Sequence, residues 1–327
     1  MKKSLIVRMA AAAVLAGFAT GANALTEIRM FTFGSATNLP VWIAQDLGLF
    51  EKQGLKVIRE TTRGSKMQMR EMMAGKYHIA TTAFDNIVAY NEGKGATKFD
   101  NYDMFAFLGV HSGMNSVVTS PDVKKWSDIK GKTASVDAVT SGYATVLYQI
   151  LKDKGLVRDK DYKVISVGST RARVKSLREK TSQIAIISSP ADFRLQADGY
   201  NILADAARSL GDYQASVYAT RRSWAKGHEK ELLAFSRAII AAHDVIHNDK
   251  KKAMEVLKKH VKGVTNADMD KMFARMAGEG GFAKKAALST RGMQTVLDLR
   301  SVYGGQKFSG GYKKYIDQSY AQKAMKK

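Results

Sequence analysis

The stretch from Asn38 to Val57, NLPVWIAQDLGLFEKQGLKV, decides how the chain is organised. Its apolar part opens with Pro40 and stops before Gly48, which is the usual order for a helix, because proline fits the first turn and glycine fits the residue after the last. One further turn leads into Leu55–Thr62, which has the pattern of a strand. Because Glu27–Phe33 alternates between polar and apolar residues, the sequence predicts a strand–loop–helix–strand unit at the amino end.

This alternation of strands and helices continues along most of the chain. Further strands are expected at residues 77–82, 105–110, 116–119, 132–136, 162–167, 183–188 and 215–220, and helices at 66–74, 85–92, 141–154 and 171–179. From His228 onward the pattern is helical, with helices expected at 229–248, 250–261, 266–276 and 290–303. Strands that alternate with helices at this spacing pair in parallel, so the sequence predicts an α/β fold with a helical C-terminus.

Residues 1–24 have the composition of a secretory signal peptide. Lys2, Lys3 and Arg8 form a basic start, an apolar stretch follows, and the tripeptide ANA at 22–24 matches a cleavage site. We therefore expect export and a soluble mature protein that diffuses freely in the periplasm of a Gram-negative bacterium. The sequence holds no cysteine, which excludes disulfides, a thiolate nucleophile, a cysteine-based zinc site and a lipid anchor on cysteine.

The formal net charge of +22 points to an anionic partner as one possibility. Export argues against nucleic acid. The lysines are dispersed beside apolar helical positions, so a solvated basic surface explains most of the charge. An acidic small molecule is the specific alternative. Roughly 300 residues remain after the signal peptide, which is enough chain for two domains.

Five segments spread over nearly the whole mature chain match one known family. They are LPVWIAQDLGLFEKQGLKV at 39–57, GKYHIATTAFDNIVAY at 75–90, WSDIKGKTASV at 126–136, the segment 168–177, and KYIDQSYAQKA at 314–324. Through them the chain resembles the periplasmic substrate-binding proteins of ABC importers, in the type II group that binds sulfonates, taurine, nitrate and thiamine-pyrimidine precursors. A branch of eukaryotic enzymes that make this pyrimidine carries a cysteine-rich motif, which is absent here.

The resemblance implies a two-lobe, Venus-flytrap fold whose mostly parallel sheets are joined by two hinge crossings. We expect the crossings near residues 110–117 and 213–220. Lobe 1 then comprises residues 25–110 and 218–327, and lobe 2 comprises residues 111–217. The resemblance also implies that the ligand lies between the lobes. The implied partner of this monomeric receptor is an ABC permease with its ATPase at the inner membrane.

Ligands of open α/β sheets bind beyond the carboxyl ends of the strands, where helix N-termini present unpaired N–H groups and a positive dipole end. The candidates in lobe 1 lie in the loop before the first helix, in its first turn, and after the third strand: Ser35, Thr37, Asn38, Trp42, Phe84, Asp85 and Asn86. Each has a plainer alternative. The polar residues cap helices, with Asp85 or Asn86 as an N-cap, while Trp42 and Phe84 pack in the core.

The first crossing adds His111, Ser112 and Asn115, in a segment whose small polar residues suit a hinge. His111 either donates to an anion or is a hydrogen-bonded structural residue. The candidates in lobe 2 are Thr140, Ser141, Tyr143, Thr170, Arg173, Ser189 and Tyr213. Arg173 is the preferred ion partner, because an arginine at a helix start pairs bidentately with a carboxylate or sulfonate. A surface arginine is the alternative.

The sequence shows no nucleophile with a base at a defined spacing and no glycine motif for phosphate or dinucleotide binding. His243 and His247 share a helix face but lack a third metal ligand at a recognisable spacing. We therefore expect a non-enzymatic receptor, without metal or cofactor, for a small organic anion such as a sulfonate or an aliphatic or aromatic carboxylate. The alternatives are a thiamine pyrimidine precursor or similar heterocycle as ligand, an enzyme on the same fold, and a binder of anionic polymers.

Overall fold

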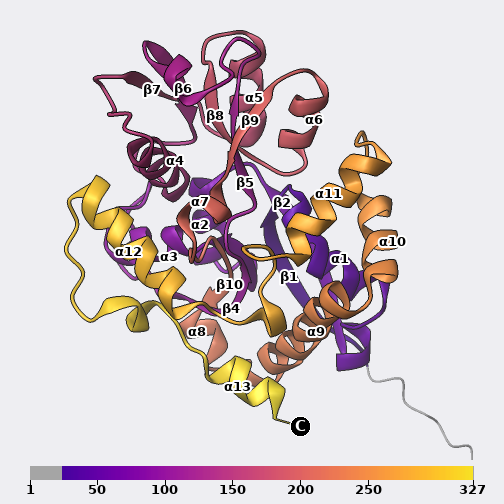
Figure 1. Cartoon of the computed structure of the whole chain (residues 1–327). Helices are drawn as coiled ribbons and strands as arrows, with labels where there is room; N and C mark the ends of the chain where they lie inside the picture. Colours follow the sequence, from indigo (N-terminus) through magenta and orange to yellow (C-terminus); the bar gives the residue numbers. More distant parts are fainter. Residues whose placement is uncertain (1–23, 327) are drawn as a thin grey trace, which may run out of the picture.

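The computed structural model of the protein describes residues 24–326. The expected signal peptide, except for Ala24, lies outside these described residues. Two five-stranded sheets are stacked one above the other with helices around each, and the chain passes from one sheet to the other and back (Figure 1). We call the part built on the first sheet lobe 1 and the part built on the second sheet lobe 2. This is the expected two-lobe α/β fold.

Each sheet contains one strand that runs against the other four. The sheet of lobe 1 has the order β2 (Leu55–Thr62), β1 (Thr26–Phe33), β3 (Ile79–Ala83), β10 (Ser216–Arg221), β4 (Met104–His111). The sheet of lobe 2 has the order β7 (Tyr162–Ser166), β6 (Lys132–Val136), β8 (Ile184–Ser188), β5 (Asn115–Thr119), β9 (Asn201–Asp205). The opposed strands are β10 and β5. The sheets are therefore mostly parallel in direction, as predicted, but mixed in their pairing.

The chain crosses between the sheets at two places. β4 ends at His111 in lobe 1 and β5 begins at Asn115 in lobe 2, so only three residues make the first crossing. The return runs from β9 through the short helix α7 (Ala206–Leu210) to β10. The opposed strand of each sheet thus directly follows a crossing. The division of the chain at 110/111 and 217/218 stays a prediction.

Helices fill the connections and the C-terminal third of the chain. Those of the first two thirds are α1 (Leu39–Asp46), α2 (Ser65–Met73), α3 (Phe84–Asn91), α4 (Gly142–Asp153), α5 (Thr170–Arg178), α6 (Ala191–Ala197) and α7. The later ones are α8 (Arg222–Ala225), α9 (Glu229–Asn248), α10 (Lys250–His260), α11 (Asn266–Ala277), α12 (Thr290–Gly304) and α13 (Ser319–Met325). Short 3-10 turns are η1 (Ala36–Asn38), η2 (Glu51–Gln53), η3 (Trp126–Ile129), η4 (Lys284–Ala286) and η5 (Gly311–Tyr315).

The strands and helices predicted from the sequence are present with small shifts at their ends. The prediction missed β9 and the short helices α6, α7 and α8, and it gave no bounds for α13 within the region expected to be helical. β9 has the sequence NILAD, which lacks the alternation of polar and apolar residues that marks a strand with one buried face. Every position of this strand is half-buried. α7 and α8 have 5 and 4 residues, which is too few for a helical period to be visible.

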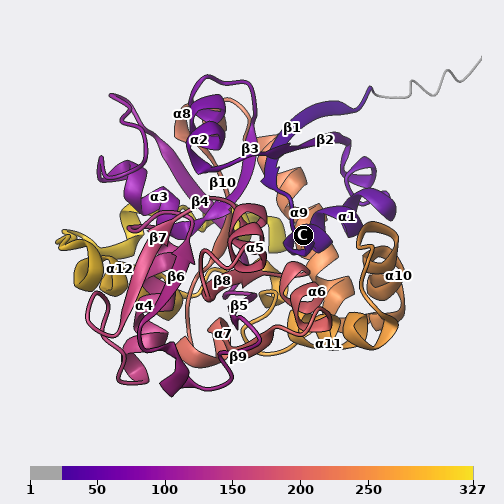
Figure 2. The same ribbon diagram turned by 90° about the horizontal axis from the view of Figure 1, so that it is seen from above.

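The stretch from Asn38 to Val57 contributes to the core of lobe 1. Leu39, Val41 and Ile43 in α1 are fully buried, and the helix packs against α9 and α10. Trp42 stacks on His260 of α10 with 4.7 Å between ring centroids. Figure 2 shows α1, α9, α10 and α11 together on one side of the molecule and α3, α4 and α12 on the other. The C-terminal helices therefore flank the crossings on both sides.

Candidate functional site

The loops that end the strands of the two lobes meet between the sheets. The Ala36 N–H, in η1 of lobe 1, donates to the Ser189 carbonyl oxygen after β8 of lobe 2 at 3.3 Å. The Gly142 N–H, at the start of α4 in lobe 2, donates to Asp85 Oδ2 at the start of α3 in lobe 1 at 2.9 Å. We call this region, with the first crossing, the interlobe interface.

Asp85 lies at the centre of this interface and is only 3% exposed. Its Oδ1 atom accepts a hydrogen bond from Arg300 Nη1 of α12 at 2.7 Å, and its Oδ2 atom accepts from Gly142 N. Burial raises the pKa of the Asp85 carboxyl, and the Arg300 charge and both hydrogen bonds oppose that rise. The predicted helix-capping role is wrong for Asp85 and Asn86, because Ala83 is the N-cap of α3.

Gly142 allows the two lobes to approach closely beside Asp85. A Cβ atom at position 142 would lie 2.6 Å from Asp85 Cβ and 3.0 Å from the Tyr213 hydroxyl oxygen. Tyr213, which precedes β10, is 3% exposed, and burial raises the pKa of its hydroxyl well above the ordinary value. Tyr213 and Asp85 were both predicted for the site, and the structure brings them together. Gly142 was missed as a residue with a role.

A second group of polar side chains surrounds the first crossing. Ser188 Oγ donates to Asn115 Oδ1 at 2.7 Å, which joins the end of β8 to the start of β5. Burial raises the pKa of the Tyr143 hydroxyl, and hydrogen bonds with Asn115 and Ser216 oppose that rise. Tyr143 of α4 therefore lies against the ends of both opposed strands. Asn115 and Tyr143 were predicted for the site.

Arg173 is buried rather than exposed, so the surface-arginine alternative is wrong. It is 2% exposed, and its guanidinium donates to the Ile186 carbonyl oxygen at 2.8 Å, to the Gly168 carbonyl oxygen at 2.6 Å and to Thr170 Oγ1 at 3.0 Å. Burial lowers the pKa of Arg173, while the nearby Asp137 and Tyr143 raise it. These contacts use three of the five guanidinium N–H donors. A ligand contact by Arg173 stays a prediction.

The loop before α1 is held by its own polar side chains. Ser35 Oγ lies 2.5 Å from Thr37 Oγ1 and accepts from Thr37 N at 3.3 Å, which caps η1. Asn38 Nδ2 donates to the carbonyl oxygens of Phe33 at 2.7 Å and Ser35 at 3.0 Å. Asn38 is 1% exposed. The capping alternative thus describes Ser35, whereas Asn38 ties the loop to the end of β1.

The start of α4 uses its own donors in the same way. Ser141 Oγ accepts from Ala144 N at 3.1 Å and donates to Asp137 Oδ1 at 2.5 Å. Ser141 is therefore the N-cap of α4, while Thr140 before it is exposed. With Gly142 N bonded to Asp85, two of the first N–H groups of this helix have partners within the protein.

His111 is a structural histidine in this arrangement. Its Nδ1 atom accepts from Gly113 N at 3.1 Å and from Met114 N at 3.4 Å, so the neutral ring carries its proton on Nε2. Burial lowers the pKa of His111 to about 3, with a smaller contribution from His243. The ring stays neutral at physiological pH. Beside it, Ser112 N donates to the Gly281 carbonyl oxygen at 3.2 Å.

The side chains of Phe84, Trp42, Asn86 and Ser189, which complete the predicted set, have partners within the protein. Phe84 is fully buried and packs edge-on against Tyr315 with 6.2 Å between centroids, so the core alternative describes it, as it does Trp42. Asn86 Nδ2 donates to Thr82 Oγ1 at 3.1 Å. Ser189 Oγ donates to Asp192 Oδ2 at 3.1 Å.

Two arginines of the C-terminal helices were not predicted. Arg300 holds Asp85, and Arg275 of α11 reaches into lobe 2. Arg275 Nη1 lies 2.5 Å from Asp192 Oδ2, and Arg275 Nε lies 2.8 Å from Asp205 Oδ2 at the end of β9. No local signal marks either arginine, because each lies on a helix that is far along the chain from its partner.

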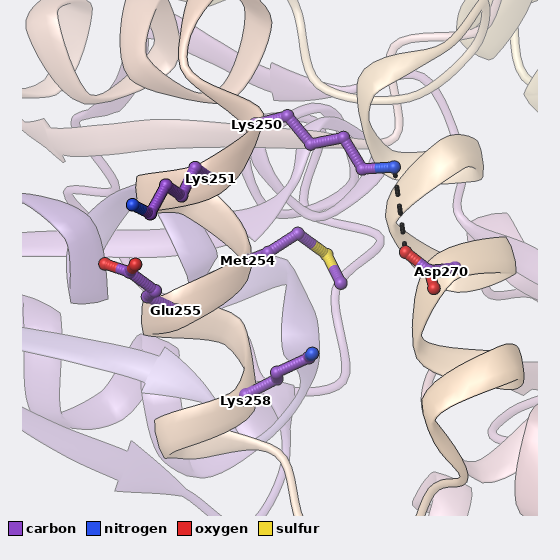
Figure 3. Close-up of a pocket in the computed structure, with 6 residues that line it drawn as sticks. All are labelled: Lys250, Lys251, Met254, Glu255, Lys258 and Asp270. Atoms are coloured by element: carbon purple, nitrogen blue, oxygen red, sulfur yellow. Dashed lines mark ion pairs between the residues drawn. The ribbon is translucent and has the colours of Figure 1, made fainter.

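A surface hollow of about 540 Å³ lies between α10 and α11 (Figure 3). It is lined by Lys250, Lys251, Met254, Glu255, Lys258 and Asp270. Lys250 Nζ lies 3.6 Å from Asp270 Oδ1 and joins the two helices across it. None of the predicted site residues lines this hollow, and most of its side chains are solvated. It forms no part of the interlobe interface.

The sequence of the chain matches a known family over a range that includes both crossings between the lobes. A family model described as NMT1/THI5 like matches residues 36–253, which is more than half of the chain. The chain belongs to the NMT1/THI5-like family. The matched range begins in η1, before α1, and ends within α10.

The chain is also similar to one curated relative and to solved structures. The putative binding protein YtlA of Bacillus subtilis is 23% identical over 220 residues, which are 64% of this chain and 62% of that protein. The match thus spans less than two thirds of that relative's length. The periplasmic nitrate-binding protein NrtA from Synechocystis PCC 6803 superposes with a TM-score of 0.72 at 12% identity, over 92% of this chain and 89% of that chain.

A further structure is the alkanesulfonate-binding protein SsuA from Xanthomonas axonopodis pv. citri, bound to MOPS. It superposes with a TM-score of 0.68 at 15% identity, over 91% of this chain and 97% of that chain. At such identities the likeness shows the fold, which is the two-lobe periplasmic-binding-protein fold. Across residues 24–326, no helix combines the length and the apolar character that a membrane span requires.

Proposed function

We propose that this protein is the solute-binding component of an ABC importer and that it acts in the periplasm as a monomer. It holds a small organic ligand between its lobes and delivers the ligand to the permease and its ATPase. It is a receptor and performs no chemistry on the ligand. Membership of the NMT1/THI5-like family and the two-lobe fold support this proposal.

The observation that carries the proposal is the meeting of strand ends from both lobes beside the two crossings. The loops after β1 and β3 face the loops after β6 and β8, and direct hydrogen bonds join them. A ligand held there contacts both lobes, so it stabilises their closed arrangement over an open one. The first crossing is short enough to act as a hinge.

The first candidate ligand is a small organic anion, either a sulfonate or a carboxylate. The net charge of +22 favours it by attracting anions. The alkanesulfonate named for one structural relative belongs to this class, and the nitrate named for another is a small inorganic anion. Arg173 keeps N–H donors beyond its three protein contacts, so it is the proposed ion partner.

The second candidate is a neutral or basic heterocycle such as a pyrimidine. It is favoured by the Asp137 carboxylate near the interface, which accepts a hydrogen bond from Ser141 Oγ and from no other side chain of residues 24–326, so it retains acceptor capacity. Tyr143 and Tyr213 lie in the same region. An amino group on a heterocycle would pair with such a carboxylate.

A thermal-shift screen tests the receptor proposal and separates the two candidates. We expect methanesulfonate, nitrate, benzoate or an aminopyrimidine to raise the melting temperature, because a solute that binds only the folded state stabilises it in proportion to the logarithm of its concentration above Kd. No shift with any small solute, together with salt-sensitive binding to an anionic polymer, would contradict the receptor proposal. Turnover of a bound solute would favour an enzyme.

Arg173→Ala tests the anion candidate. For an anionic hit we expect the affinity measured by calorimetry to fall more than tenfold, which corresponds to about 1.4 kcal/mol. Arg171→Ala is the matched control, because Arg171 lies on the same helix but is exposed. Equal affinities in the wild type and in Arg173→Ala would remove Arg173 from the site and leave the heterocycle as the better candidate.

A further inference from the structure

Asp85, Gly142 and Arg300 join three segments that are far apart in the sequence. Asp85 begins α3 of lobe 1, Gly142 begins α4 of lobe 2, and Arg300 lies on the C-terminal helix α12. We propose that this contact is a latch that holds the lobes closed. We further propose that the Asp85 carboxylate takes the place at the start of α4 that an anionic ligand would otherwise occupy. We call the three residues the Asp85 latch.

The start of α4 is a natural position for a negative charge. The first N–H groups of a helix lack partners within the helix and lie at its positive dipole end. Here the Gly142 N–H donates to Asp85 Oδ2 at 2.9 Å and the Ala144 N–H donates to Ser141 Oγ at 3.1 Å. The anion at this helix start is thus the protein's own carboxylate. An anionic ligand of the closed protein binds at other donors of the interface.

The charged groups of the latch are buried, so their stability depends on the hydrogen bonds between them. The side chains of Asp85 and Arg300 are 4% and 6% exposed. Two buried charges are tolerated only when each has its partner and its hydrogen bonds, because both have lost hydration. Separation of the lobes takes the Gly142 N–H away from Asp85. Opening therefore costs a charge-assisted hydrogen bond, which is stronger than one between neutral groups.

Position 142 needs glycine because of the close contact with Asp85 and not because of the backbone conformation of α4. Its backbone has no positive φ, so alanine could adopt the same conformation. Alanine is also the better helix former. The obstacle is space alone, since a Cβ atom would lie 2.6 Å from Asp85 Cβ. Gly142→Ala should therefore leave each lobe folded and prevent the closed contact.

The absence of cysteine from the sequence makes this directly measurable. Lys52→Cys in lobe 1 and Lys160→Cys in lobe 2 place spin labels at two exposed positions. The distance distribution between them, measured by pulsed electron–electron double resonance without any transport ligand, reports the populations of closed and open protein. Gly142→Ala and Asp85→Ala are introduced into this background. Gly227→Ala is the matched control, because a Cβ atom there would meet no atom within 4 Å.

We expect Gly142→Ala and Asp85→Ala each to raise the ratio of open to closed protein at least tenfold, and Gly227→Ala to leave it unchanged. Formate should restore the closed distance in Asp85→Ala, because it replaces the missing carboxylate between Arg300 and the Gly142 N–H. Formate should not restore Gly142→Ala, in which the Cβ atom still blocks the contact. Sodium chloride at equal ionic strength controls for screening.

Wild-type distance distributions in folded Gly142→Ala would overturn the latch. So would equal restoration of both variants by formate, or restoration by chloride, because either result would show a general salt effect. If Asp85→Ala fails to fold without formate, Gly142→Ala alone decides the question. The experiment contains no transport ligand, so its failure would leave the proposed solute-binding function untouched.

Discussion

Two arginines of the C-terminal helices each bind a buried carboxylate near the boundary of the lobes, and the two carboxylates differ in how many other partners they have. Asp85 accepts from Arg300 and from one further donor, the Gly142 N–H. Asp192 accepts from Arg275, and also from Ser116 Oγ at 2.8 Å, Ser189 Oγ at 3.1 Å and its own neighbour Phe193 N at 2.9 Å. Without its arginine, Asp85 keeps one hydrogen-bond donor, whereas Asp192 keeps three.

This difference shows how to distinguish a movable contact from a fixed one. The contacts of Asp192 besides Arg275 come from lobe 2 itself, so its carboxylate is held whether or not α11 is near. Asp85 has partners from α12 and from the other lobe only. We infer that the Asp85 side of the boundary responds to lobe motion, while Arg275 fastens α11 onto a preformed acceptor.

The largest expected effect is that of Arg300→Met. Removal of one partner of a buried ion pair leaves an uncompensated charge, so we expect the free energy of unfolding in urea to fall by about 3–5 kcal/mol. Arg291→Met is the control on the same helix, because that side chain is 86% exposed and lies 3.6 Å from its partner Asp212. A loss in Arg300→Met no larger than in the control would mean that Asp85 is not dependent on Arg300.

The loss of unfolding free energy in Arg300→Met should depend on pH. Burial raises the folded-state pKa of Asp85 above the ordinary value of 3.8, and Arg300 limits that rise. Without Arg300 the folded-state pKa rises further, so the folded protein binds more protons than the unfolded protein between 3.8 and the new pKa. Stability then falls as pH rises through this window.

We therefore expect the difference between Arg300→Met and the wild type to be largest at pH 7 and to shrink toward pH 4, as Asp85 becomes neutral. Urea unfolding at pH 7, 5.5 and 4 measures it. A difference that is constant over this range would mean that the loss comes from packing of the long arginine side chain and not from the unpaired carboxylate.

Arg275→Met should have the next largest effect. Asp192 keeps three donors in this variant, and the side chain of Asp205 is 14% exposed and can be hydrated. We expect the free energy of unfolding to fall by about 1.5–3 kcal/mol, as for a hydrogen bond to a charged group. A loss equal to that of Arg300→Met would remove the distinction between the two carboxylates.

The smallest expected effect belongs to Tyr303→Phe. Tyr303 Oη donates to Gln149 Oε1 of α4 at 3.0 Å, on the same side of the molecule as the Asp85 latch. The contact is half-exposed and joins neutral groups, so we expect a loss below about 1 kcal/mol in the same unfolding assay. A larger loss would mean that α12 depends on this contact, and not on Arg300, for its position against α4.

The scaffold could be predicted from the sequence because its signals are local. The helix at Leu39–Asp46 and the strand at Leu55–Thr62 are marked by proline, glycine and apolar periodicity within a few residues. The missed β9 lacks such a pattern, since no position in it is fully buried. The crossings follow from the resemblance and not from any local pattern.

The sequence predicted which loops hold the candidate site, but it did not predict which side chains contact one another there. Loops after strands were correctly expected to meet, and Asp85, Asn115, Tyr143 and Tyr213 do lie together. Arg300 lies 215 positions after Asp85, on a helix whose sequence shows no special motif. No pattern in the sequence could therefore pair the two residues.

The order of strands has a consequence for how the chain acquires its structure. Lobe 2 uses a continuous run of strands, β5 to β9, so its sheet can form as soon as β9 has been made. Lobe 1 cannot, because β10 lies between β3 and β4 and is the only named strand that β4 pairs with in residues 24–326. The native strand partner of β4 therefore follows more than a hundred residues after β4 ends. The lobe that begins the chain is the last to be completed.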